Sequence, residues 1–131
     1  MKRTVERVGF ILTILLVLGA TIPPVHELKN HTHWVKVTWV PFAERHLVPR
    51  ELALNVLLFV PFGLAGPWRR APWARRLVVA AVAGAILSLG VELVQVFSHA
   101  RLPTATDVVT NALGSVTGAA LRPRRADRSR A

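Results

Sequence analysis

The stretch LVVAAVAGAILSLGVELVQVF, residues 77–97, is free of charge for 15 positions until it reaches Glu92. A helix that crosses a membrane needs roughly 20 mostly apolar residues, so this run predicts a spanning helix. At ~1.5 Å per residue, the uncharged part alone is shorter than a hydrocarbon core of ~30 Å. If this segment crosses a bilayer, Glu92 therefore lies within the membrane or at its edge.

Three more apolar runs accompany this one and lie at residues 8–23, 52–68 and 106–121. The first ends at Pro23-Pro24, and we favour an uncleaved helix there over a signal peptide because its end lacks a small-residue cleavage pattern. In the last, only 14 uncharged residues follow Asp107, so this carboxylate also lies within the membrane or at its edge if the segment crosses. The fold class predicted is all-α, a four-helix transmembrane bundle in one domain, 1–121, followed by a basic tail, 122–131, expected to be disordered.

Lysine and arginine counts predict the orientation of this bundle. Three precede the first run, four lie in the link between the second and third runs, and five lie in the tail. The opposite side carries four in the first loop, which is the longer one, and Arg101 alone in the second. Because cytoplasmic loops are enriched in these residues, both termini are expected inside, as an even number of spans requires.

Composition and charge also exclude several classes of function. The chain has 131 residues, 52% of them hydrophobic, and a formal net charge of +10. We exclude nucleic-acid binding because the arginines of the tail directly follow an apolar run and no nucleic-acid motif accompanies them. The chain has no cysteine, hence no disulfide or thiol chemistry. His26, His31 and His33 match no zinc pattern, so neither a metal site nor a cofactor is expected.

Polar and small residues recur along one face of each of the last three runs. Given the predicted orientation, the polar members would share one depth near the outer leaflet: Asn55, Glu92, Gln95, Asp107 and Asn111. Glu92 is expected to hydrogen-bond Asn111 or Asn55, or to pair with Arg101. The glycines at the inner ends, Gly63, Gly114 and Gly118, predict close helix packing, and Pro61 predicts a bend.

These polar residues have two interpretations. Interhelical hydrogen bonds in membranes stabilise packing by roughly 0.6 kcal/mol on average, so all could serve only to join helices. A charged carboxylate at the centre of a span costs about 2.5–3.5 kcal/mol on insertion scales, and a neutral side chain would join helices at lower cost. We therefore favour a functional role for Glu92 and Asp107, and weigh both interpretations equally for Asn55 and Asn111.

Three ordered motifs resemble the VanZ-like family of small bacterial membrane proteins. Asn55-x-x-Leu58-Phe59-x-Pro61-x-Gly63 resembles its first element, and Glu92-x-x-Gln95-x-Phe97 followed by Arg101 resembles the second. The run from Asp107 through Asn111 and Gly114 to Gly118 resembles the third, and Trp39-Val-Pro41-Phe42 is similar to the family's loop element. The resemblance implies a multi-pass protein of the bacterial cytoplasmic membrane, and an association with resistance to the lipoglycopeptide antibiotic teicoplanin.

Three functional hypotheses remain open from the sequence. The first is a non-enzymatic protein whose outward polar cluster binds a lipid headgroup, a lipid-linked cell-wall precursor or a lipophilic glycopeptide antibiotic. The second is an enzyme acting on a lipid-linked substrate, with Glu92 or Asp107 as general base. The third is a structural or assembly subunit that uses the polar face for packing. The sequence favours the first.

Overall fold

The computed structural model describes residues 2–24, 34, 37–44, 47–98 and 103–123. These residues form four α-helices, which are α1 (Lys2–Thr21), α2 (Pro49–Ala65), α3 (Trp73–Gln95) and α4 (Ala105–Leu121). A short 3₁₀ helix, η3 (Pro67–Arg70), joins α2 to α3. The described residues contain no strand, and Thr38 and Thr104 form an isolated parallel bridge. The predicted all-α fold with four helices is confirmed.

The helix ends differ from the predicted spans because the spans stop at charged residues, whereas the helices continue through them. Helix α1 begins at Lys2 and α3 at Trp73, so basic residues placed before each span form its first turns. Helix α2 ends at Ala65 instead of continuing to Trp68, because Gly66 and Pro67 interrupt it and η3 follows. Residues 124–131 of the tail, Arg101, and the histidines His26, His31 and His33 lie outside the described residues.

Two helices, α1 and α3, are long and apolar enough to cross a membrane. Helices α2 and α4 have 17 residues each, at the lower limit of the range for a spanning helix. Length and hydropathy thus identify two candidate spans among the described residues, and the four-span bundle remains a prediction.

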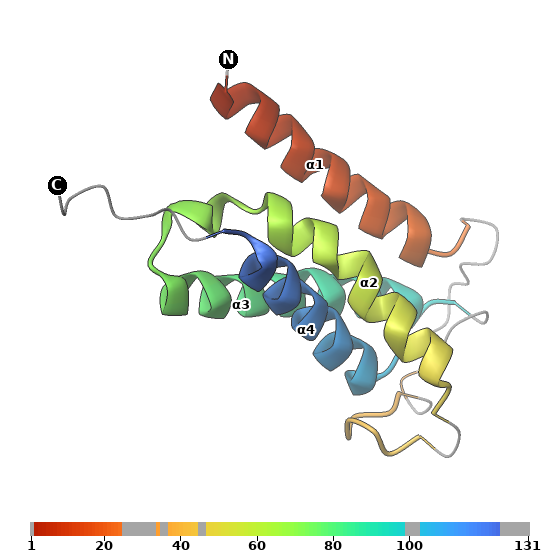
Figure 1. Cartoon of the computed structure of the whole chain (residues 1–131). Coiled ribbons are helices and arrows are strands. Elements are labelled where there is room, and N and C mark those ends of the chain that lie inside the picture. The colour runs from red at the N-terminus through yellow and green to blue at the C-terminus, as the bar shows by residue number, and fades with distance from the viewer. Residues whose placement is uncertain (1, 25–33, 35–36, 45–46, 99–102, 124–131) are drawn as a thin grey trace, which may run out of the picture.

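Helix α4 packs closely against α2 and α3 (Figure 1). Its contact with α2 is made through glycines. A Cβ at Gly114 would overlap the carbonyl of Val56, and one at Gly118 would overlap that of Val60. On α2, a Cβ at Gly63 would overlap the carbonyl of Ser115. Because glycines occupy these contact points on both helices, the two backbones come into direct contact, which increases van der Waals contact between them.

Helix α1 lies along the outside of the other three (Figure 1). Fewer of its residues are buried than of α4. It packs mainly against α2, with Val17 fully buried. Near its start, the Phe10 ring lies 5.2 Å from that of Phe62 and 5.7 Å from that of Trp68, measured between centroids. The indole of Trp68 donates to the carbonyl of Gly63 at 3.1 Å, which fixes η3 against the last turns of α2.

The distribution of side chains is inverted relative to that of a water-soluble protein. Large aliphatic side chains on all four helices are exposed, among them Leu12, Leu57, Ile86 and Leu113. The buried set instead contains many polar side chains, including Arg76, Ser88, Glu92, Gln95, Asn111 and Ser115. An apolar exterior of this extent marks contact with a partner surface or with membrane.

Candidate functional site

The first turn of α4 is where the polar residues meet. Thr104 caps the helix, its hydroxyl accepting from the Asp107 amide at 3.1 Å. The loop 37–44 is held against the same turn, because the Ala105 amide donates to the Thr38 carbonyl at 2.9 Å and the Thr38 amide to Pro103 at 3.2 Å. A helix N-terminus favours negative charge, so this turn suits the carboxylates gathered around it.

Two of the predicted carboxylates are joined to this turn. Glu92 is 6% exposed, and its Oε2 accepts from the Thr104 amide at 2.9 Å. Asp107 Oδ1 accepts from the Asn55 side-chain amide at 2.5 Å, which links α4 to α2. A continuous path of hydrogen bonds therefore runs from Glu92 through Thr104 and Asp107 to Asn55, across three helices.

Asn111 lies one turn further along α4. It is 4% exposed, and its Nδ2 donates to the Ser88 hydroxyl of α3 at 2.8 Å. Its Oδ1 is buried with no hydrogen-bond partner among the described residues. Asn111 and Asn55 are the partners expected for Glu92, but their side-chain amides donate to Ser88 and Asp107 instead. The expected pairing of Glu92 with Arg101 lies outside the described residues.

Gln95 does not join this path. Its side-chain amide is buried and donates to the carbonyl of Thr21 at 2.9 Å, so it fastens the end of α3 to the end of α1. The structure therefore brings Asn55, Glu92 and Asp107 together, sets Asn111 below them, and separates Gln95 from them. No group of three or more His, Asp or Glu side chains in the described part of the chain is arranged to hold a metal ion.

Sequence reasoning missed Glu44 in the first loop. Its Oε1 accepts from the Thr106 hydroxyl at 2.6 Å, and the same hydroxyl accepts from the Phe42 amide at 2.7 Å. Phe42 has a φ of 61°, in the left-handed region that a bulky side chain rarely adopts. No periodicity marks a loop residue such as Glu44, whereas the Thr104-x-x-Asp107 spacing is a capping signal that the sequence did offer.

The pKa of Glu44 reflects two opposing effects. Burial acts to raise the pKa of this carboxyl above its ordinary value of 4.5. Hydrogen bonds, foremost the one from Thr106, stabilise the charged form and outweigh burial, so the pKa is lowered. Glu44 is therefore a carboxylate at neutral pH, and the third one placed at the first turn of α4.

An apolar groove of about 280 Å³ opens beside this cluster, between the first loop, α3 and α4. Trp34 and Trp39 form its loop side, with their rings stacked at a centroid distance of 6.4 Å. Leu93 and Val109 are among the residues of the helical walls, and Glu92 is the one ionisable side chain in the described lining. A long apolar chain fits such walls, with a polar group beside the carboxylate.

A family model described as VanZ/LLP1 matches residues 8–124. The match covers the three motifs, the first loop and every described helix in whole or in large part. No curated protein and no solved structure matches the sequence.

Proposed function

The chain belongs to the VanZ/LLP1 family, and from this premise we propose that it is a multi-pass protein of the bacterial cytoplasmic membrane, with both termini inside, that binds a lipid-type molecule in the outward groove. The apolar exterior of all four helices supports the four spans, because a bilayer would cover these side chains. Helices α2 and α4 are short enough to need local thinning of the bilayer or snorkelling of flanking residues, which membranes tolerate.

The observation that carries the proposal is the junction of groove and carboxylate. An acyl or polyprenyl chain would lie between Trp39, Leu93 and Val109, and the headgroup would reach Glu92. Since Glu92 and Asp107 accept hydrogen bonds, the part of the headgroup beside them should offer donors, such as hydroxyl or amino groups. A glycosylated lipid-linked cell-wall precursor and a lipophilic glycopeptide both offer donors of this kind, and Arg101 would contact any anionic group.

The remaining predicted residues have supporting roles in this proposal. Asn55 holds Asp107, and Asn111 holds Ser88, so both keep α4 in register with its neighbours. Gln95 fixes the outer end of α1 near the site. Pro61, Gly63, Gly114 and Gly118 set the shape and close packing of the helices on which the cluster rests.

Binding to the purified full chain in detergent tests the proposal. The probes are a polyprenyl-linked disaccharide precursor and teicoplanin. Leu93→Trp should fill the groove and weaken binding of the preferred probe at least about tenfold, a loss of ~1.4 kcal/mol. The matched control is Leu57→Trp, the same substitution at an exposed site on α2 outside the groove. Equal binding by the two variants would refute the groove.

Glu92→Gln tests the headgroup contact, because Gln keeps an acceptor for the Thr104 amide and removes the charge. We expect weaker binding with unchanged helicity. In a teicoplanin-susceptible bacterium, wild type should raise the inhibitory concentration of teicoplanin more than that of vancomycin, and Glu92→Gln should abolish the increase. An unchanged teicoplanin threshold with wild type would remove the resistance role for this protein.

The same incubations test the enzyme alternative, which the position of the Glu92 carboxylate in the groove makes worth examining. Conversion of the lipid-linked probe, abolished by Glu92→Gln, would establish an enzyme and replace the binding proposal. If both Glu92→Gln and Asp107→Asn lower membrane yield without affecting any binding, the protein is a structural subunit instead.

A further inference from the structure

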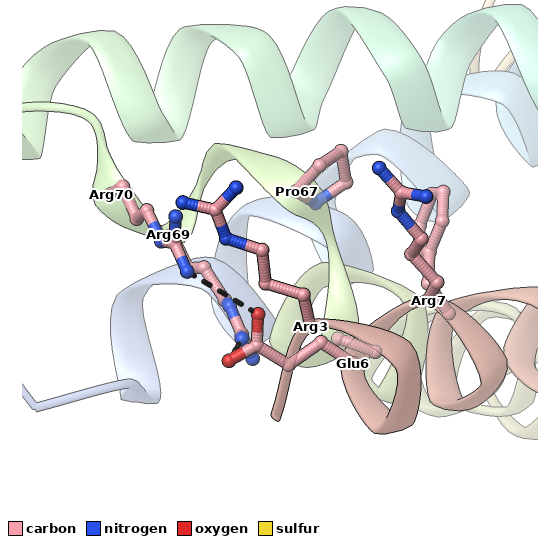
Figure 2. A pocket seen from close by; sticks show the side chains of 8 residues that line it. Arg3, Glu6, Arg7, Pro67, Arg69 and Arg70 are labelled. Carbon is pink, nitrogen blue, oxygen red and sulfur yellow. Dashed lines mark ion pairs between the residues drawn. The ribbon is translucent and has the colours of Figure 1, made fainter. Parts of the chain in front are cut away.

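A second pocket of about 280 Å³ lies at the opposite end of α2 from the carboxylate cluster (Figure 2). It lies between the first turns of α1 and the turn formed by η3. Arginines dominate its polar lining, whereas the outward groove has a carboxylate in that place. The four arginines are Arg3, Arg7, Arg69 and Arg70.

The charges in this pocket do not balance. Glu6 is the one acidic residue in its lining, and it forms an ion pair with Arg69 and a longer one with Arg70, at 3.7 Å. Figure 2 shows Arg3 and Arg7 extending from α1 alongside η3. Neither has an ion-pair partner among the described residues. The lining thus holds four guanidinium groups and one carboxylate, an excess of positive charge that favours an added anion.

The chemistry of the lining identifies the anion. Guanidinium groups bind phosphate with paired N–H donors, and arginine is preferred where this geometry matters. The pocket also has an apolar side, formed by Phe10, Ala65 and Pro67. Free phosphate gains no free energy from contact with an apolar surface, whereas the glycerol and first methylenes of a phospholipid would pack on it. Helix α1 has no acidic residue in its first turn, so its N-terminal amides add to the positive potential.

We propose that this pocket binds the phosphate of an anionic phospholipid from the cytoplasmic leaflet, and that the lipid fastens α1 to η3. The leaflet assignment rests on the orientation proposed above, whereas the preference for a lipid of net negative charge rests on the arginines alone. Helix α1 has few other attachments at this end, namely the ring contacts of Phe10 and the ion pairs of Glu6. A bound lipid would therefore add a connection to α1, the least packed of the four described helices.

Native mass spectrometry of the detergent-purified full chain tests this site. Phosphatidylglycerol and phosphatidylcholine with identical acyl chains are added separately, and bound lipid is counted. Wild type should retain phosphatidylglycerol preferentially. The double variant Arg3→Gln/Arg7→Gln should weaken that binding about tenfold, since it removes two charge-assisted donors. Circular dichroism checks that the helices are retained.

The control is Arg50→Gln/Arg75→Gln, which removes the same charge at two exposed arginines that do not line the pocket. It should bind phosphatidylglycerol within about twofold of wild type. Equal losses in the two double variants would mean unspecific attraction and would overturn the site. Full competition by inorganic phosphate at equal concentration would overturn the lipid as the ligand.

Two variants distinguish lipid binding in the arginine pocket from ligand binding in the outward groove. Leu93→Trp should leave phosphatidylglycerol retention at the arginine pocket unchanged, and Arg3→Gln/Arg7→Gln should leave binding of the precursor or glycopeptide unchanged. Failure of one proposal is thus visible without failure of the other. Loss of retention with Leu93→Trp alone would assign the counted lipid to the groove and overturn the arginine pocket.

Discussion

Helices α4 and α1 are held in the protein by different means. Helix α4 contacts α2 at backbone distance and α3 through Ser115 against Gly84. Its capped first turn accepts a hydrogen bond from α2 and donates hydrogen bonds to the loop and to α3. Helix α1 is attached by ring contacts, an ion-pair group at one end and the Gln95 bond at the other. A site built on α4 is therefore preformed, whereas a site that involves α1 can adapt to its ligand or be completed by it.

The largest effect should come from substituting a glycine of α4. Gly114→Ala places a methyl group against the Val56 carbonyl, which must move with the α2 backbone. We expect a loss of about 2–3 kcal/mol in stability, measured by unfolding in mixed detergent. The matched substitution on α1 is Gly9→Ala, where nothing lies within 4 Å of the added Cβ. It should cost nothing measurable; equal losses in the two variants would contradict the contrast.

A smaller effect is expected where α4 joins α2 through the Asn55–Asp107 hydrogen bond. A double-mutant cycle with Asn55→Leu and Asp107→Leu should give a coupling energy of about 0.6–1.7 kcal/mol, the range found for bonds between membrane helices. The control cycle pairs Asn55→Leu with Leu113→Ala, an exposed position of α4. No coupling in the first cycle would mean that the side chains are not bonded.

The ion pairs of α1 should contribute still less to stability. Glu6 is partly exposed, with its side chain 34% accessible, so Glu6→Gln should cost at most about 1 kcal/mol and less at high salt. The control is Glu51→Gln, in the first turn of α2 and without a described ion pair. The stability of both variants is measured in mixed detergent at low and high salt. If Glu6→Gln lost more stability than Gly114→Ala, α1 and not α4 would be the more firmly held helix.

The sequence predicts the helices and their inward faces better than it predicts contacts between them. Spacing along α3 places Ser88, Glu92 and Gln95 on one face, and all three are buried. Their partners depend on where loops return: Glu92 meets the Thr104 amide because the chain between α3 and α4 brings the cap there. Gln95 meets α1, which no periodicity within α3 can reveal.

The ends of the helices were the weaker part of the prediction for a related reason. Charge marks where a helix leaves the apolar region, not where it stops, so Arg75 and Arg76 continue α3 beyond its predicted start. Arg76 is buried, with its guanidinium 4.8 Å from the Trp73 ring centroid and donating to the carbonyl of Arg122 at 3.1 Å. Arg76, interpreted only as a topology signal, thus proves to be a packed part of the start of α3.

The smallest effect concerns the loop that covers the first turn of α4, and it depends on pH. Because the pKa of Glu44 is lowered on folding, its contribution to holding the loop is complete above pH 4.5, its ordinary value. That contribution is lost as the pH falls through the lowered value, since protonation weakens the bond from Thr106. Acidification should therefore loosen the stack of Trp34 on Trp39, measured as quenching of their fluorescence by acrylamide.

The comparison is made in a background with Trp68 and Trp73 replaced by Phe, so that only the loop indoles report. Glu44→Gln keeps an acceptor for the Thr106 hydroxyl but cannot titrate, and should remove the dependence below pH 4.5. Glu6→Gln, at the other end of the molecule, should leave it intact. If the loop loosens at the same pH in the Glu44→Gln variant, the responsible group is another carboxylate at the first turn of α4, and Glu44 does not anchor the loop by its charge.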